Sequence, residues 1–201
     1  MTSTASATPT ASTSAAIPDA HWRTRDILVA AVLGVAFGVV FWAWGIAWGL
    51  LAPLNAAAPF IRDLFYAVWL MPAVLAPLIV RKPGAALFAE MVAAGLSALL
   101  GSAWGVDTLL SGFVQGAAAE LIFAFTLYRL WSFPVLALAA VASAAAAWIH
   151  DWVLYYPDTA LEIQVARGIA MAISAVVIVA FGSVLLERSL RRAGVLDGFP
   201  A

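Results

Sequence analysis

The chain has 201 residues, of which 65% are hydrophobic and 10% are charged, and its formal net charge is -1. Nucleic-acid binding is excluded, because no basic stripe is present to neutralise phosphates. Cysteine is absent, which excludes disulfides, thiolate metal sites and cysteine nucleophiles. With a mean hydropathy of +1.00 and long apolar runs, the composition is typical of a polytopic helical membrane protein.

Residues 1–20 are rich in Ser, Thr and Ala and predict a disordered cytoplasmic tail without the basic region of a signal peptide. Residues 21–192 then predict an all-α domain, a bundle of six transmembrane helices. The expected spans are 27–52, 64–80, 84–102, 108–130, 133–154 and 165–186. Residues 193–201 complete the chain as a short cytoplasmic tail.

Loop charge orients these spans. Eight of the ten basic residues fall on one side, namely Arg23, Arg25, Arg81, Lys82, Arg129, Arg188, Arg191 and Arg192. Only Arg62 and Arg167 fall on the other side. Because basic loops are retained in the cytoplasm, we expect a multi-pass plasma-membrane protein with both termini cytoplasmic.

Two isolated acids, Glu90 and Glu120, lie inside consecutive predicted spans. An ionisable side chain in hydrocarbon costs at least ~2.5 kcal/mol, so such residues commonly serve binding or proton handling. Counting from Lys82 and Arg129 places both acids ~12–14 Å from the inner boundary. We therefore predict that they share one level and bind substrate together with Gln115. The alternative is that each acid only holds neighbouring helices together.

Tryptophan is frequent, with nine residues, and most of them fall in the outer halves of the predicted spans. An interfacial aromatic belt accounts for many of these positions. The outward bias also predicts an aromatic pocket that is open to the outside and suits a flat, cationic or hydrogen-bonding heterocycle. The residues expected to line this pocket or its mouth are Trp42, Trp69, Trp104 and Asn55.

His150 and Asp151 begin the outer end of the fifth predicted span. Adjacent helical residues point about 100° apart, so we expect no aligned dyad, and we assign His150 to the interface or to substrate gating. Ser111 with His150 invites comparison with an intramembrane serine protease, but the nucleophile motif GxSG is not kept, because Leu109 replaces its first glycine. We predict no catalytic residue, no metal site and no enzymatic activity.

A ridge of small residues, Ala30, Gly34 and Gly38, runs along the first predicted helix. Such a ridge permits close helix contact, either with a partner subunit or inside the same bundle. The phosphate-binding motif GxxxxGK[ST] is absent, so ATP-driven work needs another subunit. Two further classes stay open: a proton- or cation-coupled carrier or channel that uses Glu90 and Glu120, and a noncatalytic membrane scaffold.

Three blocks carry a family resemblance: WRTRDILVAAVLGVAFGVVFWAWG at 22–45, RKPGAALFAE at 81–90 and WGVDTLLSGFVQGAAAELIFA at 104–124. They resemble the S components of energy-coupling factor (ECF) vitamin transporters, especially the YkoE branch associated with thiamine or its hydroxymethylpyrimidine precursor. The resemblance implies a subunit that captures the vitamin from outside and is carried by a transmembrane coupling protein and two ABC-type ATPases, which bind the ATP. It also implies that Ala30, Gly34 and Gly38 contact the coupling protein.

Overall fold

The computed structural model describes residues 20–54 and 58–200, and over these ranges the protein is helical without any β-strand. Asn55, predicted at the mouth of the pocket, lies outside the described residues. In chain order the elements are α1 (Thr24–Leu50), η1 (Arg62–Leu70), α3 (Pro72–Val80), α4 (Ala85–Leu99), α5 (Asp107–Phe125), α6 (Phe133–Tyr155), α7 (Leu161–Ser174), η2 (Ala175–Ala180) and α8 (Phe181–Arg192). Of these, η1 is a 3-10 helix and η2 is a π-helix.

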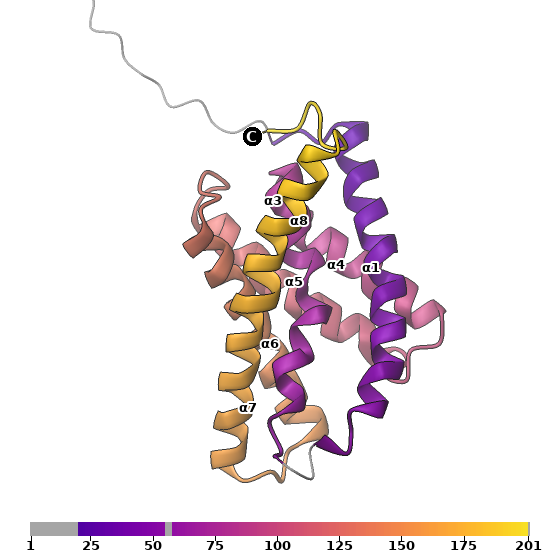
Figure 1. Cartoon of the computed structure of the whole chain (residues 1–201), viewed down its shortest axis with the longest axis vertical. Helices are drawn as coiled ribbons and strands as arrows, with labels where there is room; N and C mark the ends of the chain where they lie inside the picture. Colours follow the sequence, from indigo (N-terminus) through magenta and orange to yellow (C-terminus); the bar gives the residue numbers. More distant parts are fainter. Residues whose placement is uncertain (1–19, 55–57, 201) are drawn as a thin grey trace, which may run out of the picture.

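The elements make six apolar passes through the described part of the molecule, which confirms the predicted six-helix bundle (Figure 1). The second pass joins η1 to α3, and the sixth runs from α7 through η2 to α8. Five passes are long and apolar enough to cross a membrane, whereas α4 is shorter, with 15 residues.

Three helix ends differ from the predicted spans for local reasons. α4 ends at Leu99 because Gly101 follows in a left-handed conformation with φ of 90°. α5 ends at Phe125 because Leu127 and Tyr128 are left-handed, with φ of 52° and 55°. α8 continues to Arg192, beyond the apolar run, because a helix does not stop where hydropathy falls.

The second pass forms the centre of the bundle. Every residue of α3 is buried, and α3 contacts α1, α4, α6 and α8. Because α3 meets protein on all sides, its sequence PAVLAPLIV is apolar throughout rather than amphipathic. Alanines on α6, including Ala139, Ala140 and Ala144, are also buried in this core and allow the helices to approach closely.

The small-residue ridge of α1 is covered by α4. Ala30 is fully buried, a Cβ on Gly34 would lie 2.7 Å from Val92 Cβ, and a Cβ on Gly38 would lie 2.7 Å from Leu96 Cβ. The predicted docking role of Ala30, Gly34 and Gly38 is therefore corrected: these residues pack inside the bundle, because only small side chains permit this approach of α1 to α4.

The two ends of the bundle differ in what they carry. At the terminal end, α1 begins and α8 ends, and residues 193–200 turn back beside the start of α1 (Figure 1). In this segment Leu196 is buried, and the Arg25 guanidinium lies over the Phe199 ring. The opposite end, called here the pocket end, is formed by the loops after α1, α4 and α6.

Candidate functional site

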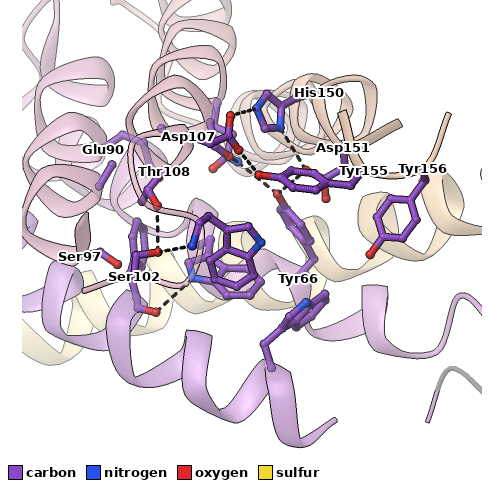
Figure 2. A pocket seen from close by; sticks show the side chains of 18 residues that line it. Tyr66, Glu90, Ser97, Ser102, Asp107, Thr108, His150, Asp151, Tyr155 and Tyr156 are labelled. Carbon is purple, nitrogen blue, oxygen red and sulfur yellow. Dashed lines mark hydrogen bonds and ion pairs between the residues drawn. The ribbon is translucent and has the colours of Figure 1, made fainter. Parts of the chain in front are cut away.

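A cavity of about 110 Å³ opens at the pocket end and is lined by side chains from α1, η1, α4, α5 and α6 (Figure 2). These elements contribute different groups: indoles come from α1, η1 and the loop before α5, while carboxylates and hydroxyls come mainly from α4, α5 and α6. The cavity therefore combines an aromatic wall with a polar wall.

The aromatic wall is a connected set of edge-to-face rings. The Trp69 ring lies 4.9 Å from that of Trp48, 5.3 Å from that of Tyr66 and 5.4 Å from that of Trp104, as measured between ring centroids. Trp69 is also fixed by a 3.4 Å hydrogen bond from its indole N–H to the carbonyl of Phe41. Because Trp48, Trp69 and Trp104 line the cavity, they offer aromatic surface to a flat ligand.

The polar wall centres on His150 at the end of α6 (Figure 2). Its Nε2 lies 3.1 Å from Asp107 Oδ1, and its Nδ1 lies 3.1 Å from Asp151 Oδ1. The hydroxyl of Tyr155 donates to the second oxygen of Asp107. An imidazolium ring would donate to both carboxylates, which leaves this cluster with a net negative charge.

The contact between His150 and Asp151 corrects the expectation that these neighbours form no aligned dyad. The angle of about 100° between successive residues describes where the Cα–Cβ bonds point, and side-chain rotation lets the carboxylate reach the ring. His150 is also buried among pocket residues, with a side chain 6% exposed. The carboxylates of Asp107 and Asp151, one at each ring nitrogen, hold the His150 ring in the cavity lining.

A chain of neutral polar groups leads away from this cluster. The Tyr66 hydroxyl lies 3.5 Å from Asp151 Oδ1 and accepts a 3.3 Å hydrogen bond from the side-chain amide of Gln115. The same amide donates to Ser111 Oγ at 2.6 Å. Near the opening, the Thr108 hydroxyl donates to Ser102 Oγ at 2.9 Å. These groups offer donors and acceptors along one side of the cavity.

Glu90 reaches the same cavity from α4 and is fully buried. One carboxylate oxygen, Oε2, accepts a 3.0 Å hydrogen bond from the backbone N–H of Ala73, where η1 passes into α3. The other oxygen, Oε1, has no hydrogen-bond partner among the described residues. A buried acceptor is costly when it stays unsatisfied, so Oε1 is a candidate contact for a ligand donor.

Glu120 lies elsewhere, and the prediction that it shares a level and a ligand with Glu90 is corrected. Its carboxylate accepts hydrogen bonds from the backbone N–H groups of Gly84, Ala86 and Leu87 at 2.6, 2.9 and 3.4 Å. The Tyr128 hydroxyl donates to it at 2.8 Å. Glu120 thus satisfies the otherwise unpaired N–H groups at the start of α4, near the terminal end.

Tyr156 marks the rim of the cavity and is held from three directions. Its hydroxyl accepts a 3.2 Å hydrogen bond from Arg62, and its carbonyl accepts a 2.7 Å hydrogen bond from Gln164. The guanidinium of Arg167 lies 3.7 Å from the centre of its ring. Arg167 in turn forms a buried ion pair with Asp63, with contacts of 2.9 and 3.3 Å.

The predicted substrate residues therefore separate into two groups. The cavity lining includes Glu90, Gln115, Trp69, Trp104 and His150. Glu120 and Trp42 do not line it: Trp42 is 37% exposed on the outer face of α1, whereas Phe41 and Trp48 face the bundle. Several lining residues were not predicted from the sequence, namely Trp48, Tyr66, Asp107, Asp151, Tyr155 and Tyr156.

Part of this missed set carried a signal. Asp107 and Asp151 are acids at helix ends on the outer side of the predicted topology, and Tyr155 and Tyr156 follow Asp151 closely. No sequence pattern placed the start of α5 beside the end of α6. Over residues 20–54 and 58–200, no group of three or more His, Cys, Asp or Glu side chains is arranged to hold a metal ion.

Comparison with known proteins identifies the class. Residues 25–146 match the family model described as the ABC-type cobalt transport system, permease component. A solved structure described as an S-component of an ECF transporter superposes with a TM-score of 0.84, at 30% sequence identity, over 89% of this chain and 90% of that chain. The chain therefore belongs to the S components of ECF transporters, which makes it a multi-pass membrane subunit of a transporter.

A named relative places it within that class. The chain is 33% identical over 182 residues to YkoE of Bacillus subtilis (strain 168), a proposed HMP/thiamine permease protein, and the match covers 88% of each sequence. The resemblance to the YkoE branch that the sequence blocks indicated is thereby confirmed. Membership of a transporter family also accords with the expectation of a non-enzymatic subunit.

Proposed function

We propose that this protein is the substrate-capture subunit of an ATP-driven ECF importer, and that its substrate is thiamine or the hydroxymethylpyrimidine precursor of thiamine. The observation that carries the proposal is the meeting of indole rings with the carboxylates of Asp107, Asp151 and Glu90 around one cavity. The name of the YkoE relative, which refers to HMP and thiamine, supports the same substrate class.

The aromatic wall suits the flat rings of these molecules. A pyrimidine ring packs against the indoles of Trp69 and Trp104, and the thiazolium ring of thiamine adds a positive charge that aromatic faces attract. The carboxylates of Asp107 and Asp151 flank His150 and add a negative potential at the same opening. The aromatic wall and the carboxylates of the polar wall together favour binding of cations over anions.

Glu90 suits the amino group of the pyrimidine. Its oxygen Oε1 is a buried acceptor beside the cavity and lacks a partner among the described residues, while Oε2 is held by the Ala73 N–H. An exocyclic amine can donate to Oε1, and the charge on the carboxylate strengthens such a bond. The pyrimidine is the part that thiamine and hydroxymethylpyrimidine share, so this contact serves either substrate.

In the proposed transport cycle, proteins other than this subunit supply the energy. We propose that a transmembrane coupling protein and two ABC-type ATPases associate with it, and that ATP is hydrolysed on the ATPases, with no cofactor held by this chain. Both termini are proposed to be cytoplasmic in the plasma membrane, because the loops of the terminal end carry most of the basic residues. The cavity then faces outward.

The geometry disfavours the alternative of a proton or cation relay through Glu90 and Glu120. Glu120 accepts hydrogen bonds from three backbone N–H groups and from Tyr128, which leaves its carboxylate committed to the start of α4. Glu90 lines the cavity, and Glu120 does not. A relay would need further polar groups between the two acids.

Ligand titration of the purified full chain tests the substrate. Trp48, Trp69 and Trp104 line the cavity, so their fluorescence should change saturably on addition of thiamine or hydroxymethylpyrimidine at micromolar concentrations. An unrelated anionic compound, such as benzoate, serves as the control. No change with thiamine or with hydroxymethylpyrimidine would refute the substrate assignment.

Uptake into liposomes tests the energy source. The chain is reconstituted alone, with the coupling protein and ATPases, and with ATPases that cannot hydrolyse ATP. Accumulation of labelled ligand should require the complete complex and hydrolysable ATP. Accumulation by the chain alone, driven by a pH gradient, would support a secondary carrier in place of the ATP-driven importer.

A further inference from the structure

The candidate substrate cavity carries acids at two depths. Glu90 is fully buried and lies nine residues before the last residue of α4, which is ~13 Å along a helix that rises about 1.5 Å per residue. Asp151 and Asp107 lie near the opening, with side chains 14% and 23% exposed. A ligand held at Glu90 therefore extends toward the carboxylates of Asp107 and Asp151.

The proposed contact of Glu90 with the exocyclic amine decides which end of the substrate faces the opening. In thiamine, the ring carbon next to that amine bears a methylene that carries the thiazolium ring, whose hydroxyethyl arm ends in the oxygen at which phosphate esters form. In hydroxymethylpyrimidine, the same methylene carries the hydroxyl. With the amine at Glu90 Oε1, both oxygens point toward the opening, and so would a phosphate group on either of them.

The opening is negatively charged. The carboxylates of Asp107 and Asp151 contact one imidazole ring, that of His150, so the cluster keeps a net negative charge even when the ring is protonated (Figure 2). The Tyr155 hydroxyl donates to Asp107 and adds no charge. Within the described ranges, no arginine or lysine belongs to the cavity lining. The opening therefore opposes a phosphate group, because bringing like charges together costs binding free energy.

Two features beside the opening that could attract an anion are already engaged. The Arg62 guanidinium donates to the Tyr156 hydroxyl at 3.2 Å and lies 4.4 Å from the centre of the Trp48 ring. The start of α5 is the positive end of a helix dipole, and Asp107 lies in its first turn, so the carboxylate of Asp107 offsets that potential. Neither feature compensates the negative charge of the cluster.

From these depths, contacts and charges, we propose that the cavity takes only the unphosphorylated compounds, and that Asp107 and Asp151 are the residues that reject their phosphate esters. This inference rests on the proposed function, because it takes the direction of the ligand from the contact between Glu90 and the pyrimidine amine. The same two carboxylates attract the thiazolium cation of thiamine and repel the phosphate of its ester. Glu90 does not discriminate, since it contacts a part of the molecule that esterification leaves unchanged.

Comparison of each compound with its own ester on the purified full chain tests the inference. Tryptophan fluorescence titration gives the affinities for thiamine, thiamine monophosphate, hydroxymethylpyrimidine and hydroxymethylpyrimidine phosphate. Each free compound that binds should bind roughly tenfold or more tightly than its ester. Equal or tighter binding of the ester would overturn the inference and leave the proposed function intact. Failure of both free compounds to bind would refute the proposed function, and the inference with it.

Two variants locate the source of the discrimination. Asp107→Asn and Asp151→Asn should each bring the affinities for thiamine and thiamine monophosphate closer together by several-fold, because thiamine loses an attraction and the ester loses a repulsion. The matched control is Asp158→Asn, which removes the same charge from an exposed position outside the lining and should keep the affinity ratio of the unmodified chain. Because the ratio compares two ligands on one variant, partial loss of folded protein does not change it. An unchanged ratio in both cavity variants would overturn the assignment to Asp107 and Asp151.

Discussion

The Nε2 atom of His150 lies 3.1 Å from Oδ1 of Asp107, across a sequence separation of 43 residues. This contact joins the end of α6 to the start of α5 at the opening of the candidate substrate cavity (Figure 2). Because Asp151 faces the other ring nitrogen, His150 holds two carboxylates in one place. Their separation, and so the local negative potential, depends on this ring.

Replacing Asp107 tests the role of that potential. Asp107→Asn keeps the size of the side chain but removes its charge, so thiamine, which is a cation, should bind about tenfold to a hundredfold more weakly, as expected for loss of a charged contact. Hydroxymethylpyrimidine, which lacks the thiazolium ring, should be affected less. Tryptophan fluorescence titration with each compound measures both affinities.

The control for this prediction is Asp158→Asn. Asp158 is exposed in the loop after α6 and lies outside the cavity lining, so the substitution removes the same charge from the same end of the molecule. Thiamine affinity should stay close to that of the unmodified chain. An equal loss in both variants would indicate general surface attraction rather than a contact at the site.

Glu90→Gln and Glu120→Gln should have different effects, although the sequence suggests equivalent roles. Glu90→Gln should weaken binding of both compounds by about 1–3 kcal/mol, because the charged acceptor at Oε1 is lost. Glu120→Gln should leave affinity nearly unchanged and lower the thermal stability in detergent, because its oxygens serve the N–H groups of α4. Fluorescence titration and a thermal melt of each variant separate the two roles. Loss of affinity in Glu120→Gln without loss of stability would contradict this assignment.

The sequence predicted the passes well because hydropathy reports which segments avoid water. It could not report side-chain direction, and depth counting therefore misplaced Glu120, which turns toward Gly84 rather than toward the level of Glu90. The same limit explains Trp42 and Trp48, which are both aromatic residues of α1 but face outward and inward respectively.

The sequence also could not show which segments far apart in the chain pack against each other. Asp107 and Tyr155 meet through the packing of α5 on α6, and neither residue marks this contact in its local sequence. The small-residue ridge of α1 was recognisable, but small residues permit close approach by any helix. Only the fold reveals that α4 is the neighbour of Gly34 and Gly38.

Packing of α1 on α4 is tested by adding a single methyl group. A Cβ at position 34 would lie 2.7 Å from Val92 Cβ and 2.9 Å from the carbonyl oxygen of Ala89, so Gly34→Ala should destabilise the protein by about 1–3 kcal/mol through overpacking. Gly49→Ala, in the same helix, is the control, since a Cβ at that position would meet no neighbouring element within 4 Å. It should be neutral or slightly stabilising. Thermal melts in detergent compare the two, and equal melting temperatures would show that α4 does not cover Gly34.

The buried ion pair between Asp63 and Arg167 predicts a non-additive pair of substitutions. Each single change, Asp63→Asn or Arg167→Gln, leaves one buried charge without its partner and should cost about 3–5 kcal/mol. The double variant should lose less stability than the sum of the two single variants, because neither charge then remains.

Arg167 also packs on the Tyr156 ring at the rim, so Arg167→Gln should weaken thiamine binding more than Asp63→Asn does. Unfolding in denaturant measures the coupling, and fluorescence titration measures the affinity. Additive losses of stability would show that the two side chains act independently, and equal affinities would remove Arg167 from any role in positioning Tyr156.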